Sequence, residues 1–259
     1  MGLQRFATLT VAIGAAVGGA ACSSDDGGGA PSLPQSNVYA GIYSDAVASG
    51  TVDVTFASPV ASRVHPAFTG QVVGANAPPV TATAVIDLGG TPVTLTGTVN
   101  TDNGDFSVTG GSYTCTGSLS NGVLEADCTG PNGPGIFSAF SDSDQVPVVQ
   151  YCGTYQIVDP VFDTGDFNMM VAEGPGYLFV IARGDGGGVI PLVGRVRDGD
   201  VVDIDMTFDD PGGGGSVRAN IDGQFYDDNA DGQFDRTDGT VFLTQGGVTA
   251  GGAFFGTRC

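Results

Sequence analysis

The chain has 259 residues, 41% of them hydrophobic and 14% charged, so it holds enough apolar residues for a buried core and is not a charge-dominated disordered chain. Its 28 acidic and 8 basic residues give a formal charge of −20. Because nucleic acids and anionic membrane surfaces are bound through basic patches, this balance argues against both as direct partners and is compatible with cation binding or with solubility.

The first 21 residues have the pattern of an export signal. Arg5 supplies positive charge, residues 6–17 form an apolar run, and small residues follow. The run is too short to span a membrane comfortably. We therefore predict a signal peptide over residues 1–21 and an exported protein of the cell envelope.

Residues 19–22, Gly-Ala-Ala-Cys, resemble the lipobox of bacterial lipoproteins, with Gly19 where the motif usually has Leu. The resemblance implies that Cys22 is lipidated and anchors the chain to a membrane. Residues 22–37 are rich in Gly, Ser, Asp and Pro and predict a flexible tether. Ordinary secretion with cleavage nearby is the alternative.

The rest of the chain repeats itself weakly. Residues 39–43 match 151–155, residues 93–99 resemble 190–196, and residues 135–137 resemble 252–255. We predict two related modules over residues 38–145 and 146–259, with a single continuous sheet system as the alternative.

Apolar and polar residues alternate with a period of two, which is typical of half-buried strands. The alternation is clear in residues 51–56, 81–86, 93–99, 167–171 and 202–208. Turn signals recur every 8 to 12 residues or so, as in antiparallel barrels and sandwiches. The sequence predicts an all-β fold of two antiparallel modules and leaves barrel or sandwich open.

The dipeptide Asn121-Gly122 is a strong signal for a type I′ hairpin turn. The register from that turn places Cys115 opposite Cys128 in a non-hydrogen-bonded pair, where Cα atoms lie about 4.5 Å apart. That distance suits a disulfide, so we predict Cys115–Cys128.

The chain has five cysteines, an odd number for an exported protein. Lipidation of Cys22 leaves four. The second expected disulfide joins Cys152 to Cys259, the first strand of module two to its last residue.

Each module opens with Gly-x-Tyr, at Gly41/Tyr43 and at Gly153/Tyr155. The pattern resembles the Gly-x-Trp start of calycin barrels such as lipocalins and avidins. In those families an Arg from a late strand covers the aromatic ring, a role that the resemblance would give to Arg258.

Residues 227–238 resemble an EF-hand-like calcium loop placed between strands. The candidate ligands are Asp227, Asn229, Asp231, Gln233 through its carbonyl, Asp235 and Asp238. Gly232 permits the sharp turn, and Asp238 replaces the usual Glu. We predict structural Ca²⁺; a solvated acidic turn is the alternative.

No catalytic constellation stands out. His65 is the single histidine, it precedes a proline, and no Gly-x-Ser-x-Gly motif surrounds any serine. We predict a non-catalytic, membrane-tethered envelope lipoprotein that binds a glycan, a protein or a small ligand. A calycin-like carrier, which requires an apolar lumen, and an Asp-based hydrolase are the alternatives.

Overall fold

The structure, a computed structural model, describes residues 36–58, 78–143, 146–159, 163–172, 176–184, 188–210 and 214–259. The predicted signal peptide, Cys22, most of the tether and His65 lie outside the described residues. In the described part of the chain, no helix is long and apolar enough to cross a membrane.

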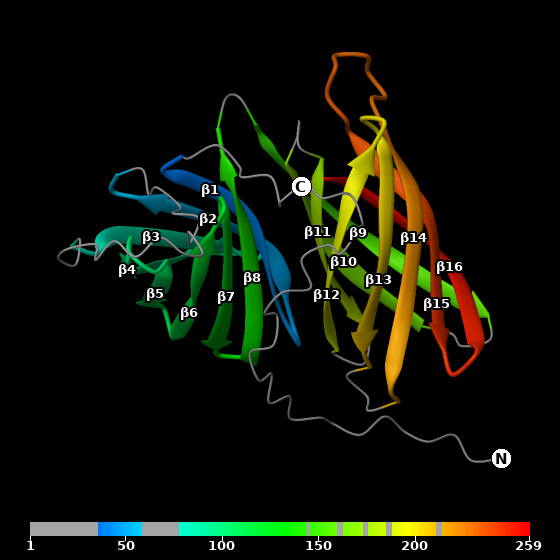
Figure 1. Cartoon of the computed structure of the whole chain (residues 1–259), viewed down its shortest axis with the longest axis horizontal. Coiled ribbons are helices and arrows are strands. Elements are labelled where there is room, and N and C mark those ends of the chain that lie inside the picture. Colours follow the sequence, from blue (N-terminus) through cyan, green and yellow to red (C-terminus); the bar gives the residue numbers. More distant parts are fainter. Residues whose placement is uncertain are drawn as a thin grey trace, which may run out of the picture.

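The described residues form sixteen antiparallel strands, arranged as two closed barrels of eight (Figure 1). Barrel 1 comprises β1 (Val38–Asp45), β2 (Ser49–Phe56), β3 (Val80–Asp87), β4 (Val93–Val99), β5 (Asp105–Gly110), β6 (Tyr113–Ser120), β7 (Val123–Gly130) and β8 (Gly133–Asp142). Barrel 2 comprises β9 (Val148–Asp159), β10 (Asp163–Ala172), β11 (Tyr177–Gly184), β12 (Val189–Arg197), β13 (Val201–Asp209), β14 (Ser216–Tyr226), β15 (Arg236–Gln245) and β16 (Val248–Arg258). The predicted all-β fold in two modules is confirmed, and the modules are barrels.

Each barrel runs up and down, with every strand beside its sequence neighbour and the first strand paired with the last. The weak sequence repeat has a structural counterpart in this closure. Tyr43 lies opposite Phe137 in barrel 1, and Tyr155 lies opposite Phe254 in barrel 2. The alternating apolar residues line the two interiors because successive side chains of a strand point to opposite faces.

The hairpin between β6 and β7 has the predicted geometry. Asn121 and Gly122 have φ angles of 53° and 77°, as a type I′ turn requires. The register from this turn pairs Cys115 with Cys128, and their disulfide is buried with a Cα–Cα distance of 4.1 Å.

The second predicted disulfide is also present. Cys152 in β9 is bonded to Cys259, which follows β16, at a Cα–Cα distance of 5.3 Å. The bond therefore reinforces the seam at which barrel 2 closes.

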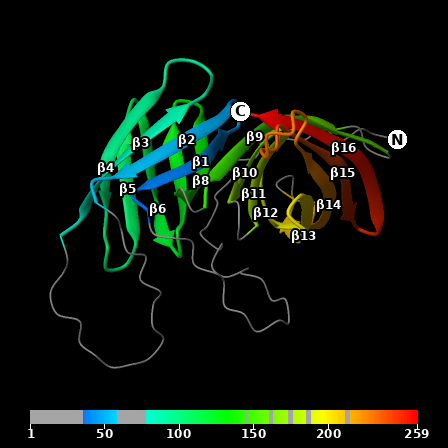
Figure 2. The same ribbon diagram turned by 90° about the horizontal axis from the view of Figure 1, so that it is seen from above.

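The barrels pack against each other side by side (Figure 2). Ile42 and Phe140 of barrel 1 form one buried cluster with Met170 and Phe179 of barrel 2. The amide of Gln150 also donates a hydrogen bond to the carbonyl of Gly41 at 2.7 Å. The outer faces of β1, β8, β10 and β11 are thus buried between the barrels.

Candidate functional site: the lumen of barrel 2

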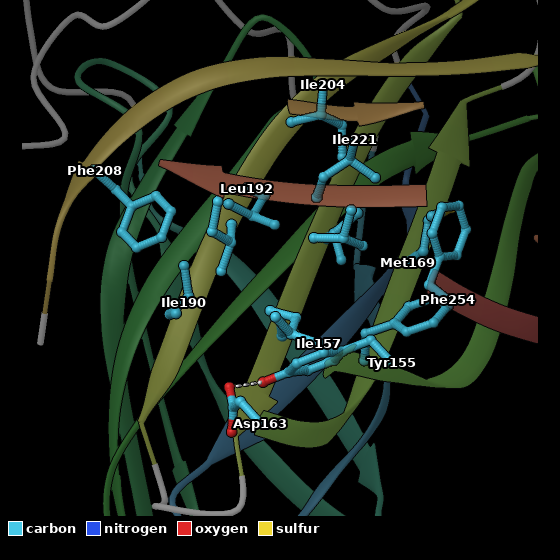
Figure 3. Close-up of a pocket in the computed structure, with 15 residues that line it drawn as sticks. Tyr155, Ile157, Asp163, Met169, Ile190, Leu192, Ile204, Phe208, Ile221 and Phe254 are labelled. Atoms are coloured by element: carbon cyan, nitrogen blue, oxygen red, sulfur yellow. Dashed lines mark hydrogen bonds between the residues drawn. The ribbon is translucent and has the colours of Figure 1, made fainter. Parts of the chain in front are cut away.

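Barrel 2 contains a cavity of about 80 Å³ that is partly open to solvent (Figure 3). It is lined by Tyr155, Ile157, Asp163, Phe167, Met169, Val180, Ala182, Ile190, Leu192, Ile204, Phe208, Ile221, Val241, Leu243 and Phe254. Every strand of the barrel contributes at least one aliphatic or aromatic side chain to the lining. Asp163 is the one charged residue among them.

The interior of barrel 1 contains packed aromatic rings. Phe106 makes edge-to-face contacts with Phe56 and Phe137, with ring centroids 6.3 and 5.8 Å apart. The buried Cys115–Cys128 disulfide belongs to the same core. An eight-stranded barrel has an interior just wide enough to be filled by side chains or to hold one small ligand.

A polar pair lies at one side of the apolar lining of barrel 2 (Figure 3). The Tyr155 hydroxyl donates a hydrogen bond to Oδ2 of Asp163 at 3.2 Å. Two glycines make room for it: a Cβ on Gly165 would lie 2.7 Å from the Tyr155 ring, and one on Gly184 would lie 3.2 Å from its hydroxyl. Because Asp163 begins β10, the pair marks one end of the barrel.

Barrel 1 has a related pair at the corresponding end. The Tyr43 hydroxyl donates to Oδ2 of Asp45 at 2.9 Å, and Asp45 is fully buried. The backbone N–H groups of Val47 and Ala48 donate to the other carboxylate oxygen, each at 2.8 Å. Burial, followed by the hydrogen bond to Asp45, raises the pKa of Tyr43 above its ordinary value. The buried Asp45 carboxylate at this end of barrel 1 is therefore bound by donors of the protein itself.

Three aromatic side chains pack together at the opposite end of barrel 2. Phe234, in the loop between β14 and β15, packs on Phe225 with centroids 5.6 Å apart, and Phe225 packs on Tyr151 at 5.0 Å. The Tyr151 hydroxyl donates to the Phe234 carbonyl at 3.2 Å. The predicted calcium loop thus carries the side chain that helps to cap this end.

The side chains of that loop hold its own backbone. Asp227 accepts hydrogen bonds from the N–H groups of Asp231 and Gly232 at 3.1 and 2.7 Å. Asn229 accepts a bond from the Asp231 N–H, and Asp231 accepts one from Gln233. Gly232 has a φ of 86°, consistent with the sharp turn expected there.

The last two predicted ligands, Asp235 and Asp238, have other partners. Asp235 accepts the N–H of Asp228 at 3.0 Å. Asp238 lies within β15 and is bound by the Tyr226 hydroxyl at 3.1 Å and by Arg236 at 2.5 Å. Among the described residues, no three His, Cys, Asp or Glu side chains are gathered as metal ligands. The calcium site stays a prediction.

The calycin resemblance gives Arg258 the role of covering an aromatic ring. In the structure Arg258 donates a hydrogen bond to Gln233 at 2.5 Å. An arginine–ring contact occurs elsewhere, where Cζ of Arg236 lies 3.8 Å from the centre of the Tyr226 ring. The eight-stranded barrels match the coarse feature of the calycin resemblance, the closed antiparallel barrel.

Sequence reasoning missed Asp163, which is one of many acidic residues and stands in no motif. The signal that was present is its position, at the start of a strand beside a repeat of the Gly-x-Tyr motif.

No protein-family model matches the chain, and a comparison with curated proteins gives no significant match.

Proposed function

We propose that this chain is an exported, lipid-tethered and non-catalytic binding protein, and that the lumen of barrel 2 holds a small apolar molecule or the end of a longer apolar chain. The observation that supports it is the cavity in one barrel, lined almost entirely by apolar side chains. Ligand sites in proteins are typically apolar pockets with a few placed polar groups.

The volume of the cavity limits the size of the group that can enter it. The cavity measures about 80 Å³. An engineered apolar cavity of about 150 Å³ accepts benzene, and typical drug-sized sites have about 300–1,000 Å³. The lumen therefore suits a short alkyl or cyclic group, with any remainder of the ligand outside the barrel. Each methylene that enters contributes about 0.8 kcal/mol.

The lipid anchor at Cys22 and a calcium ion in the 227–238 loop are part of the proposal. Calcium would order the loop that presents Phe234, and so keep one end of barrel 2 capped while the other admits ligand. What supports this is the position of Phe234 against Phe225 and Tyr151.

Adjacent methionines provide a direct test. Met169 lines the cavity, whereas Met170 is buried between the barrels. The full chain carrying ¹³C-methyl methionine is titrated with hexan-1-ol and followed by NMR. We expect the Met169 methyl signal to shift saturably while the Met170 signal stays in place. Equal shifts of both signals, or none at saturating alcohol, would contradict the proposed function.

A matched pair of variants locates the binding. Ala182 lines the cavity, whereas Ala253 is exposed on the outer face of the same barrel. Ala182→Leu fills the lumen and should abolish the Met169 response, and Ala253→Leu should leave it unchanged. If both variants bind hexan-1-ol like the original chain, the alcohol does not occupy the lumen.

A further inference from the structure

We propose that the rings of Phe167 and Phe254 form the floor of the lumen of barrel 2 and set the length of the alkyl chain that the lumen takes. This inference rests on the proposed function and deepens it, since it names the ligand class: short, linear aliphatic chains that enter with the methyl end first. Longer chains bind with no further gain, because their extra methylenes stay outside the barrel.

The Phe254 ring lies over two glycines of neighbouring strands. Gly223 on β14 pairs with Gly239 on β15, and Gly239 pairs with Phe254 on β16. A Cβ on Gly223 would lie 2.5 Å from the Phe254 ring, and one on Gly239 would lie 2.6 Å from it. These distances are shorter than a van der Waals contact, so the ring occupies the space that side chains at the two positions would fill.

Phe167 is seated in the same way on the next strands. Gly256 on β16 pairs with Gly153 on β9, and Gly153 pairs with Phe167 on β10. A Cβ on Gly153 would lie 2.6 Å from the Phe167 ring, and one on Gly256 would lie 2.8 Å from it. The rings of Phe167 and Phe254 meet edge to face, with centroids 5.7 Å apart. Together they cover the inner face of β14, β15, β16 and β9 at this level of the barrel.

The cavity ends at these two rings. Phe167 and Phe254 both line it. On β14, the lining residue Ile221 precedes Gly223 by two positions, and Phe225 follows Gly223 by two. Phe225 belongs to the rings packed at the opposite end of the barrel and is not part of the lining. The floor therefore lies between the cavity and that packed end.

The chemistry of the floor decides which end of a ligand enters first. Phe167 and Phe254 present only carbon and hydrogen to the cavity, and their lining neighbours Met169 and Val241 are also apolar. A hydroxyl or charged head group pressed against them would lose its hydrogen bonds to water without replacement. A methyl end has no hydrogen bonds to lose, and its methylenes leave water favourably. The ligand therefore inserts its tail, and its head group stays toward solvent.

A series of linear alcohols measures the length limit. Butan-1-ol, hexan-1-ol and octan-1-ol are titrated into the full chain, with the Met169 methyl signal as readout and Met170 as internal reference. Each methylene that enters should tighten binding about fourfold, and each one left outside should add nothing. The cavity, about 80 Å³, is smaller than one of about 150 Å³ that accepts benzene. We therefore expect hexan-1-ol to reach the limit and octan-1-ol to bind within about twofold of it.

Matched variants identify the floor. Phe254→Leu removes ring atoms from the floor, whereas Phe106→Leu makes the same change to a ring in the core of barrel 1. Both rings are buried and packed edge to face on another ring, so the two variants lose similar packing. We expect octan-1-ol to bind at least about fourfold more tightly than hexan-1-ol in Phe254→Leu, and the original limit to persist in Phe106→Leu.

A second measurement needs no variant. Hexan-1-ol labelled with ¹³C at its terminal methyl is bound to the original chain, and NOEs from this methyl to aromatic protons are recorded. We expect contacts with the rings of Phe167 and Phe254 and none with Phe225. Contacts of these rings with the methylene next to the hydroxyl, in place of the terminal methyl, would show the reverse insertion and overturn the proposal.

The outcomes distinguish the two proposals. If no alcohol shifts the Met169 signal, the proposed function fails. If the alcohols bind but affinity still rises about fourfold per methylene from hexan-1-ol to octan-1-ol in the original chain, the floor is refuted and the lumen site stands. The same limit in Phe254→Leu and Phe106→Leu also refutes it. Should Phe254→Leu fail to fold, as judged by Met170 and circular dichroism, the length limit and the methyl contacts of the original chain still decide.

Discussion

Oδ2 of Asp166 on β10 accepts a hydrogen bond from Oγ of Ser49 on β2 at 2.8 Å, which joins the two barrels across 117 residues of sequence. The same carboxylate pairs with Arg183, at 2.8 Å from Nε and 2.7 Å from the second nitrogen. Arg183 in turn donates to the carbonyl of Val47 in barrel 1. The group forms a polar clamp beside the apolar interface.

Removing the clamp carboxylate should destabilise the protein. Asp166→Asn removes the carboxylate that pairs with Arg183, whose side chain is 22% exposed, and we expect a loss of about 1–2 kcal/mol in unfolding free energy at pH 7. Asp205→Asn breaks a similar pair with Arg218 on the exposed outer wall and should give no measurable change in denaturant unfolding. Equal losses in the two variants would contradict a role for burial.

The clamp should also be pH-dependent. Burial alone raises the pKa of Asp166, but hydrogen bonds from Arg183 and Ser49 and the charge of Arg183 outweigh it and hold this pKa below its ordinary value. Its stabilisation is therefore complete above the unfolded pKa, about 3.9, and is lost as the pH falls through the lower folded value. The stability difference between the original chain and Asp166→Asn should be constant from pH 7 to 5 and shrink in acid.

The charge of Glu125 on β7 should affect stability in the opposite direction to the charge of Asp166. Burial, and then the charge of Asp127, raises its pKa, so the ionised form destabilises the fold at pH 7. Glu125→Gln should raise the melting temperature at pH 7, and the gain should disappear as the pH falls toward the unfolded value of about 4.3. Asp127→Asn should give a smaller gain in the same direction. A lower melting temperature for Glu125→Gln at pH 7 would show that its charge is stabilising.

The glycines of the Gly-x-Tyr repeat are required by close strand approach. A Cβ on Gly41 would overlap the carbonyl oxygen of Ser138, and one on Gly153 would overlap that of Phe255. We expect Gly41→Ala and Gly153→Ala each to cost about 3 kcal/mol or more in denaturant unfolding. Gly90→Ala, where no atom lies within 4 Å, serves as the control and should be near neutral.

The two disulfides should differ in accessibility to reductant. Cys115 and Cys128 are 0% and 3% exposed, whereas Cys259 is exposed at the chain end. Dithiothreitol without denaturant should release thiols at Cys152 and Cys259 first, as read by alkylation and mass spectrometry. Because that bond closes a sequence separation of 107 residues, its loss should cost about 4–5 kcal/mol. Simultaneous labelling of all four cysteines would contradict this order.

Calcium should stabilise the loop that carries Phe234. Millimolar Ca²⁺ should raise the melting temperature relative to excess chelator, and Asp231→Ala should abolish the difference. Asp228, in the same loop, pairs with Arg236 at 2.9 Å and is not a predicted ligand. Asp228→Asn should therefore keep the calcium-dependent shift. Identical melting with calcium and chelator would reduce residues 227–238 to an acidic turn.

Several features of the fold follow from local sequence. The Asn121-Gly122 turn sets a register that brings Cys115 to Cys128, because a two-residue turn with positive φ angles leaves one pairing for the strands that follow. Alternation with a period of two sets which side chains face inward. These features depend on residues a few positions apart, so they are readable without the tertiary structure.

The site depends on contacts that are distant in sequence. The alternation is similar in both modules, yet only the packed structure shows the aromatic core of barrel 1 and the cavity in barrel 2, because packing depends on the volumes of side chains from many strands together. Asp163 stands in no motif and is one of many acidic residues. The hairpin of β9 and β10 brings Asp163 to Tyr155, but the apolar lumen beside the pair arises only when the barrel closes through β16 and β9.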